Sequence, residues 1–210
     1  MKILITSLLV LSVSLSHGQI NVHGSAGLIN CNIVYDAPGS STDIDMAAHN
    51  ATPSLGVDYG FGPHLRLSHS LYSLKAINEA ELYPGYYYNY HGVMLSNNLL
   101  VPFLHKKTGQ HFCFGPGFTY SYLYKAEQFN GNGAINLLDA GIAPNAIRGF
   151  NIIGSWVLPV SEKTDLMIWS ENTIYMTNLE KDQNQTFQLK TYSIHVKIRY
   201  SLGGSDDDSS

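Results

Sequence analysis

The chain contains few charged residues and very few basic ones. Only 13% of its 210 residues are charged, whereas soluble domains usually carry about 25%. Lysine and arginine total 12 against 16 acidic residues, so the formal net charge of −4 offers no basic surface for nucleic acid. Aromatic residues nevertheless reach 11%, and disordered chains combine few aromatics with much charge. The composition therefore excludes a nucleic-acid-binding protein and a disordered chain.

The chain also lacks an apolar run of the length that a membrane-spanning helix needs. Its most apolar stretch, Ile3 to Leu15, is shorter than the roughly 20 residues of such a helix. The stretch follows Lys2 and precedes Ser16-His17-Gly18, which places small residues three and one positions before Gln19. This pattern is typical of a cleaved secretory signal. We therefore expect a signal peptide over residues 1–18, cut near Gly18/Gln19.

Cysteine is scarce as well, because Cys31 and Cys113 are the only two. A secreted chain meets the oxidising surroundings in which such a pair can form a disulfide. The strand pattern described below places the two on the first and fifth strands, far apart around a barrel. We expect two buried thiols, with a disulfide as the alternative.

Alternation with a period of two residues is the strongest pattern after residue 19, and this period is typical of β-strands. Every even position from Phe112 to Tyr124 carries an aromatic residue or proline, while the odd positions from Cys113 to Ser121 carry small residues. Near the end of the chain, apolar residues stand at even positions from Tyr192 to Leu202. Each such stretch therefore presents one apolar face and one different face.

Eight stretches show this alternation, and several are as long as membrane-crossing strands, which need about 9–11 residues. Their apolar positions run from Ile20 to Leu28, Leu55 to Tyr59, Leu65 to Leu71, Val93 to Phe103, Phe112 to Tyr124, Phe150 to Val160, Leu166 to Met176 and Tyr192 to Leu202. The pattern predicts an all-β fold over residues 19–202, an up-and-down antiparallel transmembrane β-barrel of about eight strands with a packed polar lumen.

The connections alternate between long and short, as in outer-membrane barrels with short periplasmic turns and long external loops. Tight turns are expected at 61–63, 106–109 and 161–163, and longer stretches at 35–53, 77–87, 127–147 and 179–186. Closing the three tight turns with like faces together predicts three registers. They place Leu158 opposite Leu166, Phe103 opposite Phe112, and Asp58 opposite Arg66.

Periodicity alone does not say which face points outward. A soluble lipocalin-like barrel would bury the apolar face and show the other face to water. The second face between Cys113 and Ser121, however, consists of Cys, Gly, Thr and Ser rather than the charged residues of a water-facing strand. Small residues suit the crowded interior of a barrel of about eight strands. We therefore expect the apolar face to meet lipid.

One hairpin resembles that of a known family. The string LLVPFL at 99–104, a lysine-bearing turn and the string FGPGF at 114–118 resemble the central hairpin of PorT-like outer-membrane β-barrel proteins. In that family an IPLL strand is followed by a GxGP strand. The whole mature chain resembles this family in the arrangement of its strands, but only this hairpin resembles it in amino-acid sequence. It implies an eight-stranded barrel in a bacterial outer membrane, usually without an assigned activity. Such barrels commonly end at the final strand, whereas here residues 203–210 follow, which we expect to be a disordered acidic tail.

The few charged residues of the strands share the face that we assign to the lumen. They are Asp58, Arg66, Glu171, Lys197 and Arg199. Charges are stable in such a place when they are paired and hydrogen-bonded. We expect structural ion pairs between Asp58 and Arg66 and between Glu171 and Lys197 or Arg199. A gated conduction path is the functional alternative.

The sequence gives little indication of a metal site or of catalysis. His23 and His195 would lie on neighbouring strands, but zinc sites use three or four ligands, so we expect hydrogen-bonded histidines and no metal or cofactor. A nucleophilic hydrolase needs a nucleophile, a histidine and an orienting acid in contact. The sequence contains no G-x-S-x-G motif, and we expect no catalysis.

The most unusual local string is YPGYYYNY at 83–90. Its tyrosines Tyr83, Tyr86, Tyr87 and Tyr88 form a candidate loop patch for a glycan or an envelope protein, although a loop entering the lipid interface has the same composition. We expect a non-catalytic outer-membrane protein in contact with lipid, with a structural role or a binding role in its surface loops. The alternatives are a soluble secreted barrel with an apolar ligand and a barrel enzyme.

Overall fold

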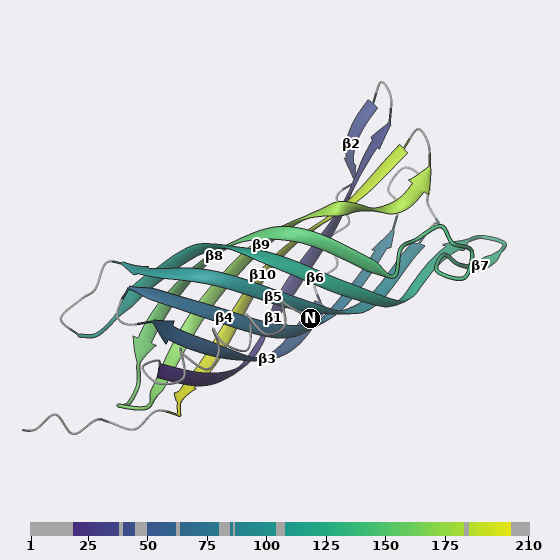
Figure 1. The fold of residues 1–210 in the computed structure, drawn as a ribbon. Helices are drawn as coiled ribbons and strands as arrows, with labels where there is room; N and C mark the ends of the chain where they lie inside the picture. The colour runs from purple at the N-terminus through teal and green to yellow at the C-terminus, as the bar shows by residue number, and fades with distance from the viewer. Residues whose placement is uncertain are drawn as a thin grey trace, which may run out of the picture.

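The computed structural model describes residues 19–37, 40–44, 50–61, 64–79, 85, 87–103, 108–182 and 185–202. Within these residues, ten strands form one sheet that closes on itself (Figure 1). Eight long strands build the wall: β1 Gln19–Ala37, β3 Asn50–Phe61, β4 Leu65–Glu79, β5 Tyr87–Phe103, β6 His111–Asn130, β8 Ala146–Pro159, β9 Thr164–Asp182 and β10 Gln185–Ser201. The predicted signal peptide at 1–18 and tail at 203–210 lie outside the described residues.

The wall is an up-and-down antiparallel barrel, as the alternation predicts. Each wall strand pairs with its neighbours in the chain, and β10 closes the barrel on β1, with Tyr200 opposite Val22 and Tyr192 opposite Asn30. The short strands β2 (Ser40–Ile44) and β7 (Gly133–Asn136) pair with β1 and β6 at the long-loop end (Figure 1). Parts of the predicted loops are therefore strand, and the wall continues beyond the apolar belt.

The apolar face points outward and the other face fills the lumen. Phe118 is 38% exposed and Val196 is 52% exposed, whereas Lys197 is fully buried. A soluble barrel with an apolar ligand requires the opposite arrangement. No helix in the described part of the chain is long and apolar enough to cross a membrane.

Two of the three predicted registers are confirmed and one is wrong. Leu158 lies opposite Leu166, and Phe103 lies opposite Phe112. The β3–β4 hairpin, however, closes with Phe61 opposite Leu65. Asp58 consequently faces Ser68 instead of Arg66, a shift of two residues that leaves each side chain on its predicted face.

The β6 strand contains the Gly115-Pro116-Gly117 string without leaving the sheet. Its pairing with β5 runs from Asn98 opposite Gly117 to Val101 opposite Phe114, and the ladder is interrupted between these two pairs. Proline has no N–H to donate, so the interruption falls where a ladder bond is missing. A Cβ atom on Gly115 would overlap the backbone oxygen of Leu99, so this close approach of two strands requires glycine.

Candidate functional site in the barrel lumen

The lumen is organised in successive levels along the barrel axis. Charged side chains from the ends of β3 and β10 lie near the short turns, and a polar network around Glu171 occupies the middle. Apolar side chains occupy the long-loop half. The predicted polar lumen is therefore packed but only partly polar, because apolar clusters lie on both sides of the network.

Glu171 on β9 is the centre of the polar network. Its Oε1 accepts hydrogen bonds from Asn151 Nδ2 at 2.6 Å and Ser96 Oγ at 2.8 Å. Its Oε2 accepts from the Tyr72 hydroxyl and from Trp169 Nε1, both at 3.2 Å. Four donors from four strands thus converge on one buried carboxylate, which satisfies the hydrogen-bonding need of a buried charge.

Lys197 on β10 is the cation of the same network. Its Nζ donates to Ser70 Oγ and to the Tyr72 hydroxyl, both at 3.2 Å. The same atom lies 3.4 Å from the centre of the Trp169 ring, a close cation–π contact. Tyr72 and Trp169 each touch both charges, so they bridge Lys197 and Glu171.

The predicted direct ion pair of Glu171 with Lys197 or Arg199 is wrong. Glu171 lies opposite Ser193, whereas Lys197 lies opposite Met167. The two charges are therefore displaced along their strands by four residues. No salt bridge joins Glu171 to either cation in the described part of the chain. Tyr72 and Trp169 connect Glu171 to Lys197 instead.

Arg199 connects the carboxylates of the short-turn end. Its Nε donates to Asp165 Oδ2 at 2.9 Å, and its Nη1 lies 3.9 Å from Asp58 Oδ2. Asp58 Oδ1 also lies 3.3 Å from His23 Nε2. The result is a cluster of one arginine, two aspartates and one histidine, in which Asp165 is partly exposed and the other three are buried.

Arg66 does not form the predicted ion pair with Asp58. It lies opposite Gly60 on β3 and opposite Leu100 on β5. Within the described residues it makes no salt bridge. The cause is the two-residue shift of the β3–β4 register, and Asp58 takes Arg199 from across the closing seam instead.

Glycines create the space for the large polar side chains. A Cβ atom on Gly56 would overlap the His23 ring, and one on Gly27 would overlap the His195 ring. A Cβ atom on Gly117 would overlap the side-chain oxygens of Asn98 and Asn151. These inward-facing glycines therefore relieve crowding in the lumen.

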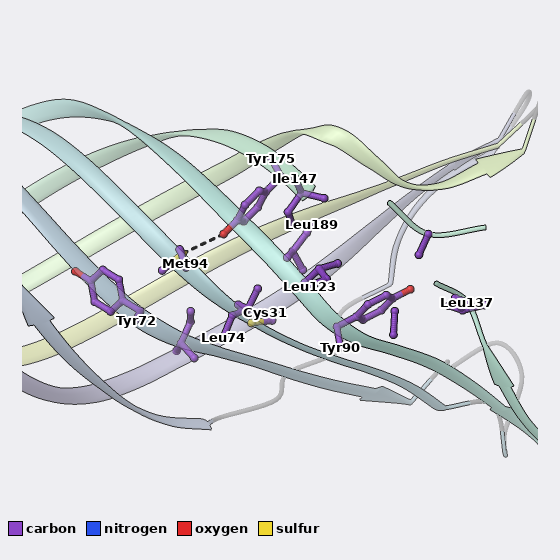
Figure 2. Packing of buried hydrophobic residues seen from close by; sticks show 13 residues of the cluster. Cys31, Tyr72, Leu74, Tyr90, Met94, Leu123, Leu137, Ile147, Tyr175 and Leu189 are labelled. Atoms are coloured by element: carbon purple, nitrogen blue, oxygen red, sulfur yellow. Dashed lines mark hydrogen bonds between the residues drawn. The ribbon is translucent and has the colours of Figure 1, made fainter. Parts of the chain in front are cut away.

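The long-loop half of the lumen is closed by an apolar cluster (Figure 2). It contains Ile29, Cys31, Tyr72, Leu74, Tyr90, Met94, Leu123, Ala126, Leu137, Ala143, Ile147, Tyr175 and Leu189. Most of these side chains have 0–1% exposure, so solvent does not reach them. The Tyr175 hydroxyl contacts Met94 Sδ at 3.0 Å (Figure 2). It also lies 2.8 Å from Ser121 Oγ, so this buried hydroxyl has hydrogen-bond partners.

The segment after β7 folds back into the barrel mouth. Leu137 N donates to Ala126 O at 2.8 Å, and the Leu137 side chain joins the apolar cluster beside Tyr90 (Figure 2). The Asn136 side chain organises the turn, since its Oδ1 accepts from Leu138 N at 3.0 Å. This segment, residues 137–143, is predicted as a loop, and in the structure it closes the barrel mouth; we call it the stopper segment.

The predicted tyrosine patch is only partly described, and its described members do not form one surface. Tyr83 and Tyr86 lie outside the described residues. Tyr87 is exposed on the outer face of β5, opposite Phe129. Tyr88 points to the mouth, where it stacks on Tyr90 at 6.3 Å and accepts from Gln128 Nε2 at 3.2 Å. Tyr90, the last residue of the string, is buried in the lumen.

The residues weighed for chemistry lie in separate pairs. Ser25 Oγ lies 3.4 Å from His195 Nδ1, and the Asp58 carboxylate contacts His23 instead. Among the described residues, no group of three or more His, Cys, Asp or Glu side chains is arranged to hold a metal ion. Cys31 and Cys113 are both free and buried, in different apolar clusters.

Sequence reasoning missed the uncharged members of the network. Tyr72, Ser96, Asn98, Asn151 and Trp169 all occupy inward positions of their strands. The alternation along each strand predicts these inward positions, since each residue stands next to an apolar residue of the belt. The predicted ion pairs named only charged residues, although a buried charge also requires neutral hydrogen-bond partners.

No protein-family model matches the chain, and no curated protein sequence gives a significant match. Among solved structures, the chain is similar to neisserial surface protein A, with a TM-score of 0.53 and 10% identity over 86% of this chain and 96% of that one. It is also similar to the outer-membrane protein OprG from Pseudomonas aeruginosa, with a TM-score of 0.50 and 10% identity over 89% and 97% of the two chains. The fold is therefore that of the eight-stranded outer-membrane β-barrels.

Proposed function

We propose that this protein is a non-catalytic barrel of a bacterial outer membrane that acts through its surface at the long-loop end. The observation that carries the proposal is the division of the wall into an apolar outer face and a lumen that holds the charges. Ile152 and Val196 are more than half exposed, while Glu171 and Lys197 are buried. Only a lipid surrounding makes such an outer face favourable, because water would leave a large apolar area unburied.

The closed lumen supports a structural or binding role over transport. Glu171 and Lys197 are held by several contacts each, and the apolar cluster with Leu137 lies between them and the long-loop mouth. Barrels of eight strands have interiors that side chains just fill. A solute would have to displace both levels to pass.

The stopper segment supplies a surface for recognition. Ile142 in this segment and Ile135 on the adjacent β7 are exposed, whereas Leu137 and Ala143 are buried. Exposed apolar side chains on an ordered segment are typical of contact sites. We therefore assign partner binding, to an envelope protein or a glycan, to this segment rather than to the tyrosine string. Kinship with PorT-like barrels is part of the proposal, supported by the β5–β6 pairing of the two strings that carry the resemblance.

The membrane location is tested by fractionation. The expected result is recovery of the full-length gene product in the outer-membrane fraction, with a gel mobility that changes on heating. Recovery in the soluble fraction without detergent contradicts the proposal. Binding is tested by a photo-crosslinking side chain at Ile142, with Ile153 in the lumen as the matched control. Discrete adducts at residue 142 alone are expected, and their absence contradicts the assigned surface.

A further inference from the structure

Three basic side chains of the wall face outward at the same level. They are Lys75 on β4, Arg148 on β8 and Lys190 on β10, and the first two are exposed. Each lies ten residues along its strand from an outward residue at the short-turn rim. The rim residues are Leu65, Leu158 and Tyr200.

Ten residues correspond to the thickness of the apolar band. A strand rises about 3.3 Å per residue, and at a tilt of about 40° ten residues climb roughly 25 Å along the axis. The lipid-facing band of an outer-membrane barrel is about 25 Å tall. The three basic residues therefore mark the edge of the band that faces the long loops.

Neighbouring strands extend this basic level. The register places Lys75 beside His91 on β5, and His91 beside Lys125 on β6. Lys125 is balanced by Glu127, whose Oε2 lies 3.0 Å from Nζ. Among the side chains that the structure describes, neither Arg148 nor Lys190 forms a salt bridge with an acidic residue. These two residues give the level a positive charge.

The opposite edge of the band is different. Among the described outward-facing strand residues near the short turns, none is lysine or arginine, and aromatic residues such as Phe103, Trp156 and Tyr200 occupy this edge. Arg66 and Arg199, although close to this end in sequence, belong to the inward face. Among the described outward-facing strand residues, lysine and arginine therefore occur at the long-loop edge of the band and not at the short-turn edge.

We propose that the basic residues Lys75, Arg148 and Lys190, on different sides of the closed barrel, bind phosphate groups of anionic lipids of the outer leaflet. Guanidinium and ammonium groups are the usual protein partners of phosphate, and each basic residue at a membrane surface attracts anionic lipid. Tyr120 lies opposite Arg148, and Tyr192 follows Lys190 on the same face, so aromatic rings flank the cations at the depth of the headgroups. The inference rests on the proposed membrane location.

The test compares the full-length protein with the variant Lys75→Gln/Arg148→Gln/Lys190→Gln, after refolding into phosphatidylcholine vesicles that contain lipid A with two phosphates or with none. Native mass spectrometry of the extracted barrel then reports retained lipid. We expect at least tenfold preference for the phosphorylated lipid, lost in the triple variant and in high salt. The variant Lys163→Gln, in an exposed turn, is the matched control and should retain the preference.

Equal retention of both lipids by the unaltered chain overturns the inference, and so does unchanged retention by the triple variant. Heat-dependent gel mobility confirms that each variant is folded. If the triple variant does not fold, Arg148→Gln alone must still lower retention, and Lys75→Arg/Lys190→Arg must preserve it. A chain that does not enter vesicles contradicts the membrane location, which separates that failure from failure of the phosphate site.

Discussion

The ammonium group of Lys197 lies 3.4 Å from the centre of the Trp169 ring in the middle of the barrel. The same indole donates its N–H to Glu171 Oε2 at 3.2 Å. One aromatic side chain therefore stabilises a cation with its face and an anion with its edge. This arrangement keeps two opposite charges in the lumen without direct contact between them.

Removal of one of these charges is expected to destabilise the barrel. Lys197→Met should lower the free energy of unfolding by about 3 kcal/mol, because Glu171 then remains as an uncompensated buried charge. The double variant Lys197→Met/Glu171→Gln should regain most of that loss. Urea unfolding in vesicles, followed by gel mobility, measures both. A double variant as unstable as Lys197→Met contradicts the coupling, and Lys163→Met serves as an exposed control.

Two glycines offer a matched test of lumen crowding. Gly117→Ala should lower the free energy of unfolding by about 1–3 kcal/mol, since the added methyl group overlaps Asn98 and Asn151. Gly154→Ala should be neutral, because its Cβ meets no atom within 4 Å. Unfolding of the two variants side by side measures the difference. Equal stability of both would show that the lumen has spare room.

An arginine scan measures which face meets lipid. Ile152→Arg, at a position 58% exposed in the middle of the belt, should cost about 2–4 kcal/mol in a bilayer. Val160→Arg, 67% exposed in the β8–β9 turn, should cost about 1 kcal/mol or less. The free energy of unfolding, measured in vesicles, is compared between the two variants. A tolerated arginine at 152 contradicts a membrane-facing wall.

The two thiols report on the closure of the lumen. Cys31 and Cys113 are free and buried, so neither should react with a maleimide in the folded barrel. Heating in detergent should expose both, giving a mass increase of two labels. Reducing agent should leave the unheated gel mobility unchanged. Rapid labelling of Cys31 in the native state would contradict the seal formed by the apolar cluster.

The strand number and the orientation of the faces were predictable, because alternation depends only on neighbours in the chain. The β3–β4 register was not, because a shift of two residues preserves every face and leaves no trace in the pattern. Asp58 consequently pairs with Arg199 rather than with Arg66.

The contacts across the lumen were not predictable for a related reason. Tyr72 on β4 reaches Glu171 on β9, and the pairing depends on how far the strands are staggered around the closed barrel. Alternation contains no information on that stagger. The buried Leu137 was missed because the sequence predicts one long loop over 127–147 and gives no sign that part of it folds back into the barrel mouth.

The closing seam between β1 and β10 makes the molecule complete only when its last strand is in place. Lys197 and Arg199 both belong to that last strand, whereas their partners Tyr72 and Asp58 belong to strands much earlier in the chain. A polypeptide that stops before residue 185 would lack both cations and would leave two strand edges unpaired. We therefore expect that such a fragment does not form a stable barrel.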